Sequence, residues 1–263
     1  MPRRPEAPRA LPTIRWAFWD LGDTLLNEDR LRYHIYERLL WAMRRAHPEI
    51  TFADLLERRA CLIGGGDKSP HYTIAWTDLS PEEYALWTEE IRHFVAGEGQ
   101  MLLNPVPGAV ETLRHLAGRY RMGIIADQPH TVEETLGRLG IRERFDVIAL
   151  NSVAGCEKSD GRLFRWALRE AGCDASEAVM VGNRTDVDIA PARRIGMRAI
   201  LCVFSPAEKG WAPDAENARL YIEALARTPN WPATPDLSAP DEAPDACVRA
   251  MAEIPPLLSR WDA

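Results

Sequence analysis

The chain of 263 residues is 46% hydrophobic and 27% charged, and its formal net charge is −7. These values are ordinary for a soluble globular protein, and the length allows one large domain or a core with an insertion. The excess of acidic residues argues against nucleic acid and anionic membranes as partners, because both require a basic surface. A small molecule is the partner that the composition favours.

The cysteines and the N-terminal residues indicate the cellular compartment in which the protein is expected. The five cysteines form no C-x-x-C pair, which argues against a disulfide framework and a thiolate zinc site. Residues 1–12 are rich in proline and lack the apolar stretch of a signal peptide, and no apolar run approaches the ~20 residues that span a bilayer. We therefore expect a disordered arm at 1–12, a cytoplasmic location and no membrane partner.

The first predicted strand covers residues 14–19, an apolar and aromatic run that ends at Asp20. The following segment, 27–99, shows helical spacing and no strand pattern. Within it, Ser80-Pro81-Glu82-Glu83 is a strong helix start, with serine as the N-cap and glutamate at the third helical position. Helices are predicted at 29–47, 51–63 and 80–95, with a turn at the glycines of 64–66.

From residue 105, helical and strand-like patterns alternate with short connections, which predicts β-α-β units and a parallel sheet. The predicted helices are 108–119, 131–139, 160–171 and 188–195, and the predicted strands are 121–126, 145–150, 178–182 and 198–203. The strand at 14–19 belongs with these strands. We therefore predict an α/β, Rossmann-like core, residues 13–26 and 100–205, with an all-helical cap domain, 27–99, inserted into it.

Residues 206–263 show a weaker pattern. The stretch 228–246 contains five prolines among acidic and small residues, which is typical of a linker or a surface wrap. We predict a proline-rich extension with a short helix near 246–254.

Four stretches, each at the end of a predicted strand, carry candidate catalytic residues. They are WDLGDTL (19–25), GIIADQP (123–129), GCEKSD (155–160) and VGNRTDVDIAPA (181–192). In this order they resemble the motifs of the haloacid dehalogenase-like (HAD) hydrolase superfamily, in the group with a helical cap inserted after the first strand. The resemblance covers roughly residues 12–203 and implies a hydrolase with a Rossmann-like fold.

The first stretch matches the family pattern D-x-D-G-T. The resemblance makes Asp20 the nucleophile, which forms an aspartyl-phosphate and ligates Mg²⁺, and Thr24 the threonine of the motif. The family's second aspartate, which acts as general acid and base, is Gly22 here, and Asp23 follows one residue later. We expect Asp23 to support the turn rather than to replace this acid, because a shift of one residue changes the side-chain direction.

The missing acid matters most for poor leaving groups. A general acid contributes about 10²- to 10⁴-fold, so an alkyl phosphate is affected more than an acyl phosphate. This holds unless Asp23 or a residue of the cap takes over the proton transfer.

The second and third stretches concern the transferred phosphoryl group. The family's substrate-binding hydroxyl is missing at Ala126, and Asp127 and Gln128 follow it. Backbone N–H groups of this turn remain candidates to bind phosphate, whereas the Asp127 side chain is as well suited to capping the next helix. Lys158 matches the family's lysine, which the resemblance pairs with Asp20 to neutralise charge on the phosphoryl oxygens.

The fourth stretch resembles the family's G-D-x-x-x-N-D. Its first acid, a Mg²⁺ ligand, is Asn183 here, and its last acid is retained as Asp188. Asn183 offers a carbonyl oxygen but removes one negative charge, so we expect weak Mg²⁺ binding. The implied metal ligands are Asp20, Gly22, Asn183 and Asp188. Asp186 is interpreted as a solvated loop residue, and Arg30 and Arg32 as a solvated helix face rather than as contacts of a substrate anion.

The leading hypothesis is a phosphatase that hydrolyses a small, anionic phosphorylated metabolite, either a phosphate monoester or an acyl phosphate. A second hypothesis is a catalytically weakened or inactive HAD-fold protein that binds a ligand in the cap cleft, because Gly22, Ala126, Asp127 and Asn183 all alter functional positions. Metal-independent dehalogenation ranks lowest. The sequence does not identify the substrate or the oligomeric state.

Overall fold

The computed structural model describes residues 13–231 and 242–262. Its centre is a six-stranded sheet in the order β5-β4-β1-β6-β7-β8, in which all neighbouring strands are parallel. The strands are β1 (Trp16–Trp19), β4 (Arg121–Ala126), β5 (Val147–Leu150), β6 (Ala178–Gly182), β7 (Arg198–Cys202) and β8 (Ala246–Val248). The predicted α/β class with a Rossmann-like parallel sheet is confirmed.

Strand β1 lies in the middle of the sheet and is buried on both faces. Trp16 and Phe18 belong to one apolar cluster, whereas Ala17 and Trp19 belong to the other, because successive side chains of a strand point to opposite faces. A strand covered on both sides reads as a continuous apolar run rather than an alternating one. Asp20, the first polar residue after this run, therefore lies at the carboxyl edge of the central strand.

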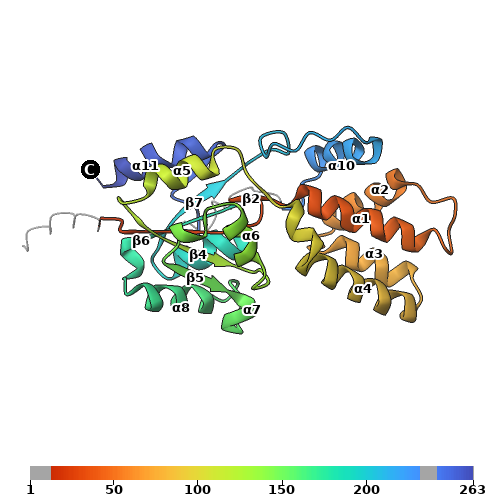
Figure 1. Ribbon diagram of the computed structural model, residues 1–263, viewed down its shortest axis with the longest axis horizontal. Helices are drawn as coiled ribbons and strands as arrows, with labels where there is room; N and C mark the ends of the chain where they lie inside the picture. Colours follow the sequence, from red (N-terminus) through yellow and green to blue (C-terminus); the bar gives the residue numbers. More distant parts are fainter. Residues whose placement is uncertain (1–12, 232–241, 263) are drawn as a thin grey trace, which may run out of the picture.

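Helices cover both faces of the sheet. Figure 1 shows α5 and α11 side by side on one face and α8 on the opposite face. The flanking helices are α5 (Ala109–Leu116), α6 (Val132–Arg138), α7 (Asn151–Ala154), α8 (Arg162–Ala171), α9 (Ala190–Arg194) and α11 (Ile254–Trp261). Short 3₁₀ turns lie at Glu98–Leu102, Arg142–Arg144, Ala175–Glu177 and Met251–Glu253.

The predicted helix at 188–195 begins differently in the structure. A π-helical turn, Thr185–Ile189, precedes α9. Turns of this type widen a helix locally and are frequent at functional sites. The turn places the side chain of Asp188 in the interior, where it is fully buried.

Four helices fill the chain between the short antiparallel strands β2 (Leu26–Asn27) and β3 (Asn104–Pro105). They are α1 (Asp29–Met43), α2 (Phe52–Gly64), α3 (Pro70–Asp78) and α4 (Pro81–Ala96), and they are called the helical insertion below. Capping boxes start α2 and α4, the latter at Ser80 and Glu83 as the sequence pattern indicates. The sequence analysis missed α3. The insertion gathers at one end of the molecule, away from α8 and α11 (Figure 1).

The C-terminal extension is more structured than the predicted wrap with one short helix. An additional helix, α10 (Glu216–Arg227), lies beside α2 and α1 of the helical insertion (Figure 1). The fully buried Arg59 of α2 donates to the carbonyl of Thr228 at 2.9 Å and to Oδ1 of Asn230 at 2.6 Å. The short helix predicted near 246–254 was wrong: Ala246–Val248 form β8, the sixth strand of the sheet, and the helix α11 begins only at Ile254 and packs on α5.

The predicted arm at 1–12 lies outside the described residues, and so does most of the proline-rich stretch. Across 13–231 and 242–262, no helix combines the length and the apolar composition needed to cross a membrane.

Candidate active site

Loops that follow three adjacent strands meet at the carboxyl edge of the sheet. Asp20 follows β1, Asp127 follows β4 and Asn183 follows β6. Because β1 lies between β4 and β6, the loops converge around Asp20. This edge is the usual ligand site of open α/β sheets.

Lys158 is the buried cation of the site. It is only 2% exposed, and its Nζ lies 2.5 Å from Oδ1 of Asp20 and 2.5 Å from Oδ1 of Asp188. Its Nζ also donates to the carbonyl of Ile125 at 3.2 Å. Burial alone would lower the pKa of Lys158, but the charges of Asp188 and Asp20 raise it above its ordinary value. Lys158 is therefore held as an ammonium group beside Asp20.

Asp20 lies in an environment that favours its protonated form more than water does. Burial raises the pKa of the Asp20 carboxyl to about 7; Lys158 opposes the rise, and the charges of Asp188 and Glu28 add to it. Two carboxylates share the one ammonium group of Lys158, which is consistent with a lysine that stays charged beside an aspartate of raised pKa. Ionised Asp20 is a poorly solvated, oriented carboxylate, as a nucleophile should be.

Asp188 stabilises the loop after β6 by hydrogen bonds. Its Oδ2 accepts from the backbone N–H groups of Asn183 at 3.1 Å and Arg184 at 2.9 Å, while Oδ1 faces Lys158. A Cβ at Gly182 would lie 2.5 Å from the Asp188 side chain, so only glycine leaves room for this carboxylate. Both oxygens of Asp188 thus have protein partners, and its predicted role as a metal ligand stays a prediction.

The remaining candidate metal donors are oxygens close to Asp20. Oγ1 of Thr24 lies 3.5 Å from Oδ1 of Asn183, so the amide oxygen of Asn183 is at the site. Within the described residues, no group of three or more His, Cys, Asp or Glu side chains is arranged to hold a metal ion. Mg²⁺ binds carboxylate, amide and carbonyl oxygens, so the side chains of Asp20 and Asn183 suit it, and the predicted role of Gly22 stays a prediction.

Asp23 is held by one cation of the nearby helix α1 and by one of the distant C-terminal extension. It is 6% exposed and has a left-handed φ of +56°. Its carboxylate pairs with Arg32 of α1 and with Lys209 of the C-terminal extension, whose Nζ is 2.9 Å away. Burial would raise the pKa of Asp23, but Arg32 and Lys209 hold it well below its usual range. Asp23 thus stays ionised and fixes the turn, as expected from its register. The solvated-face interpretation of Arg32 was wrong, because Arg32 faces Asp23 and Glu28.

Known proteins resemble this chain over the segment that contains these motifs. Residues 17–202 match the family described as haloacid dehalogenase-like hydrolase. The chain belongs to this family. A glyceraldehyde 3-phosphate phosphatase from Methanothermobacter thermautotrophicus is 41% identical over 72% of this chain and 85% of its own. The human haloacid dehalogenase-like hydrolase domain-containing protein 3 is 30% identical over 72% of this chain and 82% of its own.

Solved HAD structures share the fold. A 2-haloacid dehalogenase from Pseudomonas syringae gives a TM-score of 0.55 at 25% identity, with 95% of this chain and 100% of that chain covered. A HAD phosphatase from Thermococcus onnurineus gives a TM-score of 0.54 at 19% identity, with coverages of 93% and 98%. The resemblance drawn from the four sequence stretches is confirmed.

The loop after β4 departs from the HAD pattern as the sequence indicates. Ala126 is fully buried and offers no hydroxyl. The exposed Asp127 accepts from the backbone N–H of Lys158 at 3.3 Å, so it orients the lysine loop rather than capping α6. The amide of Gln128 donates to Oε1 of Glu28 at 2.7 Å. The two side chains therefore bind protein groups, and the peptide N–H groups of the loop remain the candidates for phosphate.

A cavity of about 490 Å³ adjoins the HAD site. It is lined by Asp23 and Asn183 on one side and by residues of the C-terminal extension on the other, among them Lys209, Trp231 and Arg249. A smaller cavity of about 270 Å³ lies between the turn at Gly66–Lys68 and the loop Arg184–Asp186. Asp186 is a solvent-exposed loop residue, as predicted, and it forms an exposed ion pair of 2.6 Å with Lys68 of the insertion across this cavity.

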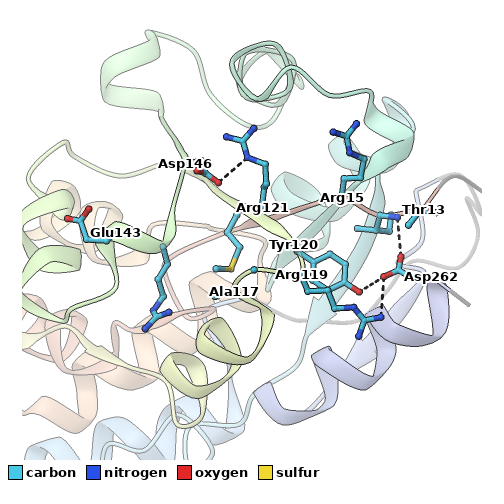
Figure 2. Close-up of a pocket in the computed structure, with 13 residues that line it drawn as sticks. Thr13, Arg15, Ala117, Arg119, Tyr120, Arg121, Glu143, Asp146 and Asp262 are labelled. Atoms are coloured by element: carbon cyan, nitrogen blue, oxygen red, sulfur yellow. Dashed lines mark hydrogen bonds and ion pairs between the residues drawn. The ribbon is translucent and has the colours of Figure 1, made fainter.

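A larger cavity, of about 710 Å³, lies elsewhere. Figure 2 shows its lining residues, which include Arg15 just before β1 and Arg121 at the start of β4. Arg121 pairs with Asp146 at 3.3 Å and Arg119 with Asp262 at 3.7 Å. This cavity is at the amino edge of the sheet, opposite to Asp20, and takes no part in the site.

Two residues of the site escaped the sequence analysis. Glu28 precedes α1, and Lys209 lies beyond the last predicted strand. Glu28 is 8% exposed and Lys209 is also 8% exposed. Glu28 had a usable signal, because it is the nearest acidic residue after the altered D-x-D-G-T stretch. Lys209 had none, since its partners Asp23 and Asp29 lie far away in sequence.

Proposed function

We propose that this HAD-like hydrolase is a phosphatase that cleaves a small phosphate monoester through an aspartyl-phosphate at Asp20. The observation that carries the proposal is the buried pair of Asp20 and Lys158 at the end of the central strand, with Nζ 2.5 Å from Oδ1. A carboxylate nucleophile and a fixed cation are the two groups that an anionic phosphoryl transfer needs in one place.

The reaction has two displacements at phosphorus. In the first, a carboxylate oxygen of Asp20 forms a bond to phosphorus while the bond to the leaving oxygen breaks, and that oxygen takes up a proton. In the second, water attacks phosphorus, loses a proton and releases inorganic phosphate, which regenerates the Asp20 carboxylate. Lys158 stays an ammonium group in both steps and stabilises negative charge on the phosphoryl oxygens.

Mg²⁺ is the cofactor that the donor set suits. It would be held by Asp20, Asn183 and the carbonyl of Gly22, with substrate phosphate and water completing its coordination. When bound, Mg²⁺ neutralises phosphoryl charge as a Lewis acid. Because Asn183 replaces a carboxylate, we propose that the ion binds weakly before the substrate arrives.

The names of the relatives and the size of the cavity support a substrate class. Five relatives, including those from Methanothermobacter thermautotrophicus and Methanocaldococcus jannaschii, are named glyceraldehyde 3-phosphate phosphatases. The 490 Å³ cavity beside Asn183 is of a size for a small metabolite, and Lys209 and Arg249 line it. We therefore propose a short alkyl phosphate of triose size, with the helical insertion serving as the cap that closes over it.

A panel of small alkyl phosphates, acyl phosphates and p-nitrophenyl phosphate, each assayed with and without Mg²⁺, tests the proposal. Asp20→Asn is the control, since it removes the nucleophilic oxygen while keeping the shape of the side chain. Metal-dependent turnover that is lost in Asp20→Asn is expected, together with a phosphoryl adduct on the Asp20 peptide after acid quenching. Equal background release from both proteins would contradict the phosphatase and leave the ligand-binding alternative.

A further inference from the structure

The position of the missing family acid is filled by another carboxylate. A Cβ placed on Gly22 would lie 2.6 Å from Oε1, 2.8 Å from Cδ and 3.0 Å from Oε2 of Glu28. An aspartate at position 22 would need that space for its own carboxyl group, which is two bonds from its backbone. The carboxylate of Glu28 therefore occupies the volume that the family's second aspartate would take.

Two side chains hold Glu28 in this place. Nε2 of Gln128, in the loop after β4, donates to Oε1 at 2.7 Å, and Arg32, one turn along α1, pairs with Oε2. The carboxylate is thus bound by Gln128 of the core and by Arg32 of the helical insertion, and only 8% of Glu28 is exposed. A group that is fixed by two partners meets the positional demands of proton transfer better than a mobile surface acid.

The other acid of the turn is unsuited to the task. Asp23 pairs with both Arg32 and Lys209, and Arg32 divides its charge between Asp23 and Glu28. Glu28 therefore shares one cation with another acid, whereas Asp23 shares two. Glu28 is the carboxylate that faces Gly22.

We propose that Glu28 replaces the family's second aspartate as the general acid and base of this phosphatase, an inference that rests on the proposed function. As the bond between phosphorus and the leaving oxygen breaks, the protonated carboxyl of Glu28 gives its proton to that oxygen and an alcohol departs. The resulting carboxylate then takes a proton from the water that attacks the aspartyl-phosphate. Glu28 is reprotonated as Asp20 is released, so the cycle closes without another proton donor.

This assignment changes the range of substrates. Without an acid, the site would be restricted to acyl and aryl phosphates, whose leaving groups depart unaided. With Glu28 in place, an alkyl phosphate of triose size can be cleaved, because its poor leaving group receives a proton. The chain would thus catalyse the same class of reaction as its named relatives. Its general acid, Glu28, would come from the start of α1 instead of from the loop that holds the nucleophile.

The decisive experiment compares two leaving groups in Glu28→Gln. Glyceraldehyde 3-phosphate represents a poor leaving group and p-nitrophenyl phosphate a good one. We expect kcat/KM to fall by about 10²- to 10⁴-fold for the alkyl phosphate and by less than about tenfold for the aryl phosphate. Equal losses for both substrates, or no loss for the alkyl phosphate, would overturn the assignment.

Control variants separate this inference from the proposed function. Asp20→Asn should abolish turnover of both substrates; if the unmodified enzyme cleaves neither, both proposals fall together. Asp23→Asn, the matched acid in the same turn, should affect both substrates to the same degree. If wild type cleaves only the aryl phosphate, the phosphatase stands and the role of Glu28 is refuted.

Two further variants address folding and position. Should Glu28→Gln fail to fold by its thermal transition, Glu28→Asp, which keeps the charge but withdraws the carboxylate by one methylene, is judged by the same difference between substrates. The double variant Gly22→Asp with Glu28→Ala should cleave the alkyl phosphate at least about tenfold faster than Glu28→Ala alone. Equal rates would contradict the equivalence of the two positions.

Discussion

Lys209 and Asp23 form a buried ion pair between residues 186 positions apart in sequence, with Nζ 2.9 Å from Oδ1. The same Nζ lies 2.5 Å from Oδ1 of Asp29, whose side chain is fully buried. One lysine of the C-terminal extension thus lies between two carboxylates that flank β2. These acids could not be buried together without a cation between them.

Removal of this cation should destabilise the fold. In Lys209→Met the buried Asp29 loses its paired cation and Asp23 keeps only Arg32, so we expect the free energy of unfolding to fall by about 3–5 kcal/mol. Urea denaturation measures the loss. Arg92→Gln breaks the exposed pair with Glu89 and serves as the control, with a change within ~0.5 kcal/mol. Similar small changes in both variants would refute the structural role of Lys209.

Gly182 should tolerate no side chain. A methyl group there would meet Asp188 at 2.5 Å, which would push the carboxylate away from Lys158 and from the backbone of Asn183. Gly182→Ala is expected to lose about 1–3 kcal/mol of stability and most of its phosphatase activity. Gly137→Ala, on α6 with open space around it, is the matched control and should be neutral or slightly stabilising. Retained activity in Gly182→Ala would show that Asp188 is not needed in its place.

Asn183 should limit the affinity for Mg²⁺. Asn183→Asp restores a second carboxylate beside Asp20, and we expect the Mg²⁺ concentration that gives half of the thermal shift to fall by about 10- to 100-fold. The readout is the melting temperature during a Mg²⁺ titration, which does not depend on turnover. Asp186→Asn changes a nearby acid that pairs with Lys68 and should leave the titration unaltered. An unchanged midpoint in Asn183→Asp would place the metal elsewhere.

His71 of α3 should make the stability depend on pH. Burial lowers the pKa of His71 to about 4, and the charges of Arg32 and Arg59 lower it as well, while Asp67 opposes them. The unfolded chain binds a proton near the ordinary pKa of about 6.5, whereas the folded chain does so only near 4. The neutral form therefore contributes stability above pH 6.5.

That contribution is lost as the pH falls toward 4. Each pH unit in this window should cost about 1.4 kcal/mol at most. The measurement is the difference between wild type and His71→Gln in denaturation series from pH 7 to 4, because other groups titrate in both proteins alike. Parallel stability curves would show that His71 is protonated in the fold as easily as in water.

The sequence carried much of the core and of the nucleophile loop. The strand ends at Asp20, Ala126 and Gly182 were predictable, since strands buried on both faces leave apolar runs that stop at the first polar or glycine residue. The pairing of Lys158 with Asp20 was implied by the resemblance to the HAD motifs. These features depend on local pattern and on one rule of parallel sheets.

What the sequence concealed depends on contacts between distant segments. Arg32 looked like a solvated arginine because its helix is rich in charge, and only the fold shows that it faces Asp23 and Glu28. The match of residues 20–24 to D-x-D-G-T shows that the family's acid is missing at Gly22. It does not show that the carboxylate of Glu28, just before α1, lies in that place. Strand β8 has three residues and α10 lacks an N-cap hydrogen bond from a side chain, so neither gave a clear local signal.

The contact of Arg59 with Thr228 and Asn230 has a consequence for motion. The helical insertion leaves and re-enters the core through β2 and β3, which is the usual arrangement for a hinged lid. Here α10 is attached to the same insertion through Arg59, while Lys209, seven residues before α10, is anchored at Asp23 beside the hinge. If the helical insertion moves as a cap, it would carry α10 along and bend the chain between Lys209 and Glu216. The short segment between Lys209 and Glu216 would then limit how far the insertion can open, in addition to β2 and β3.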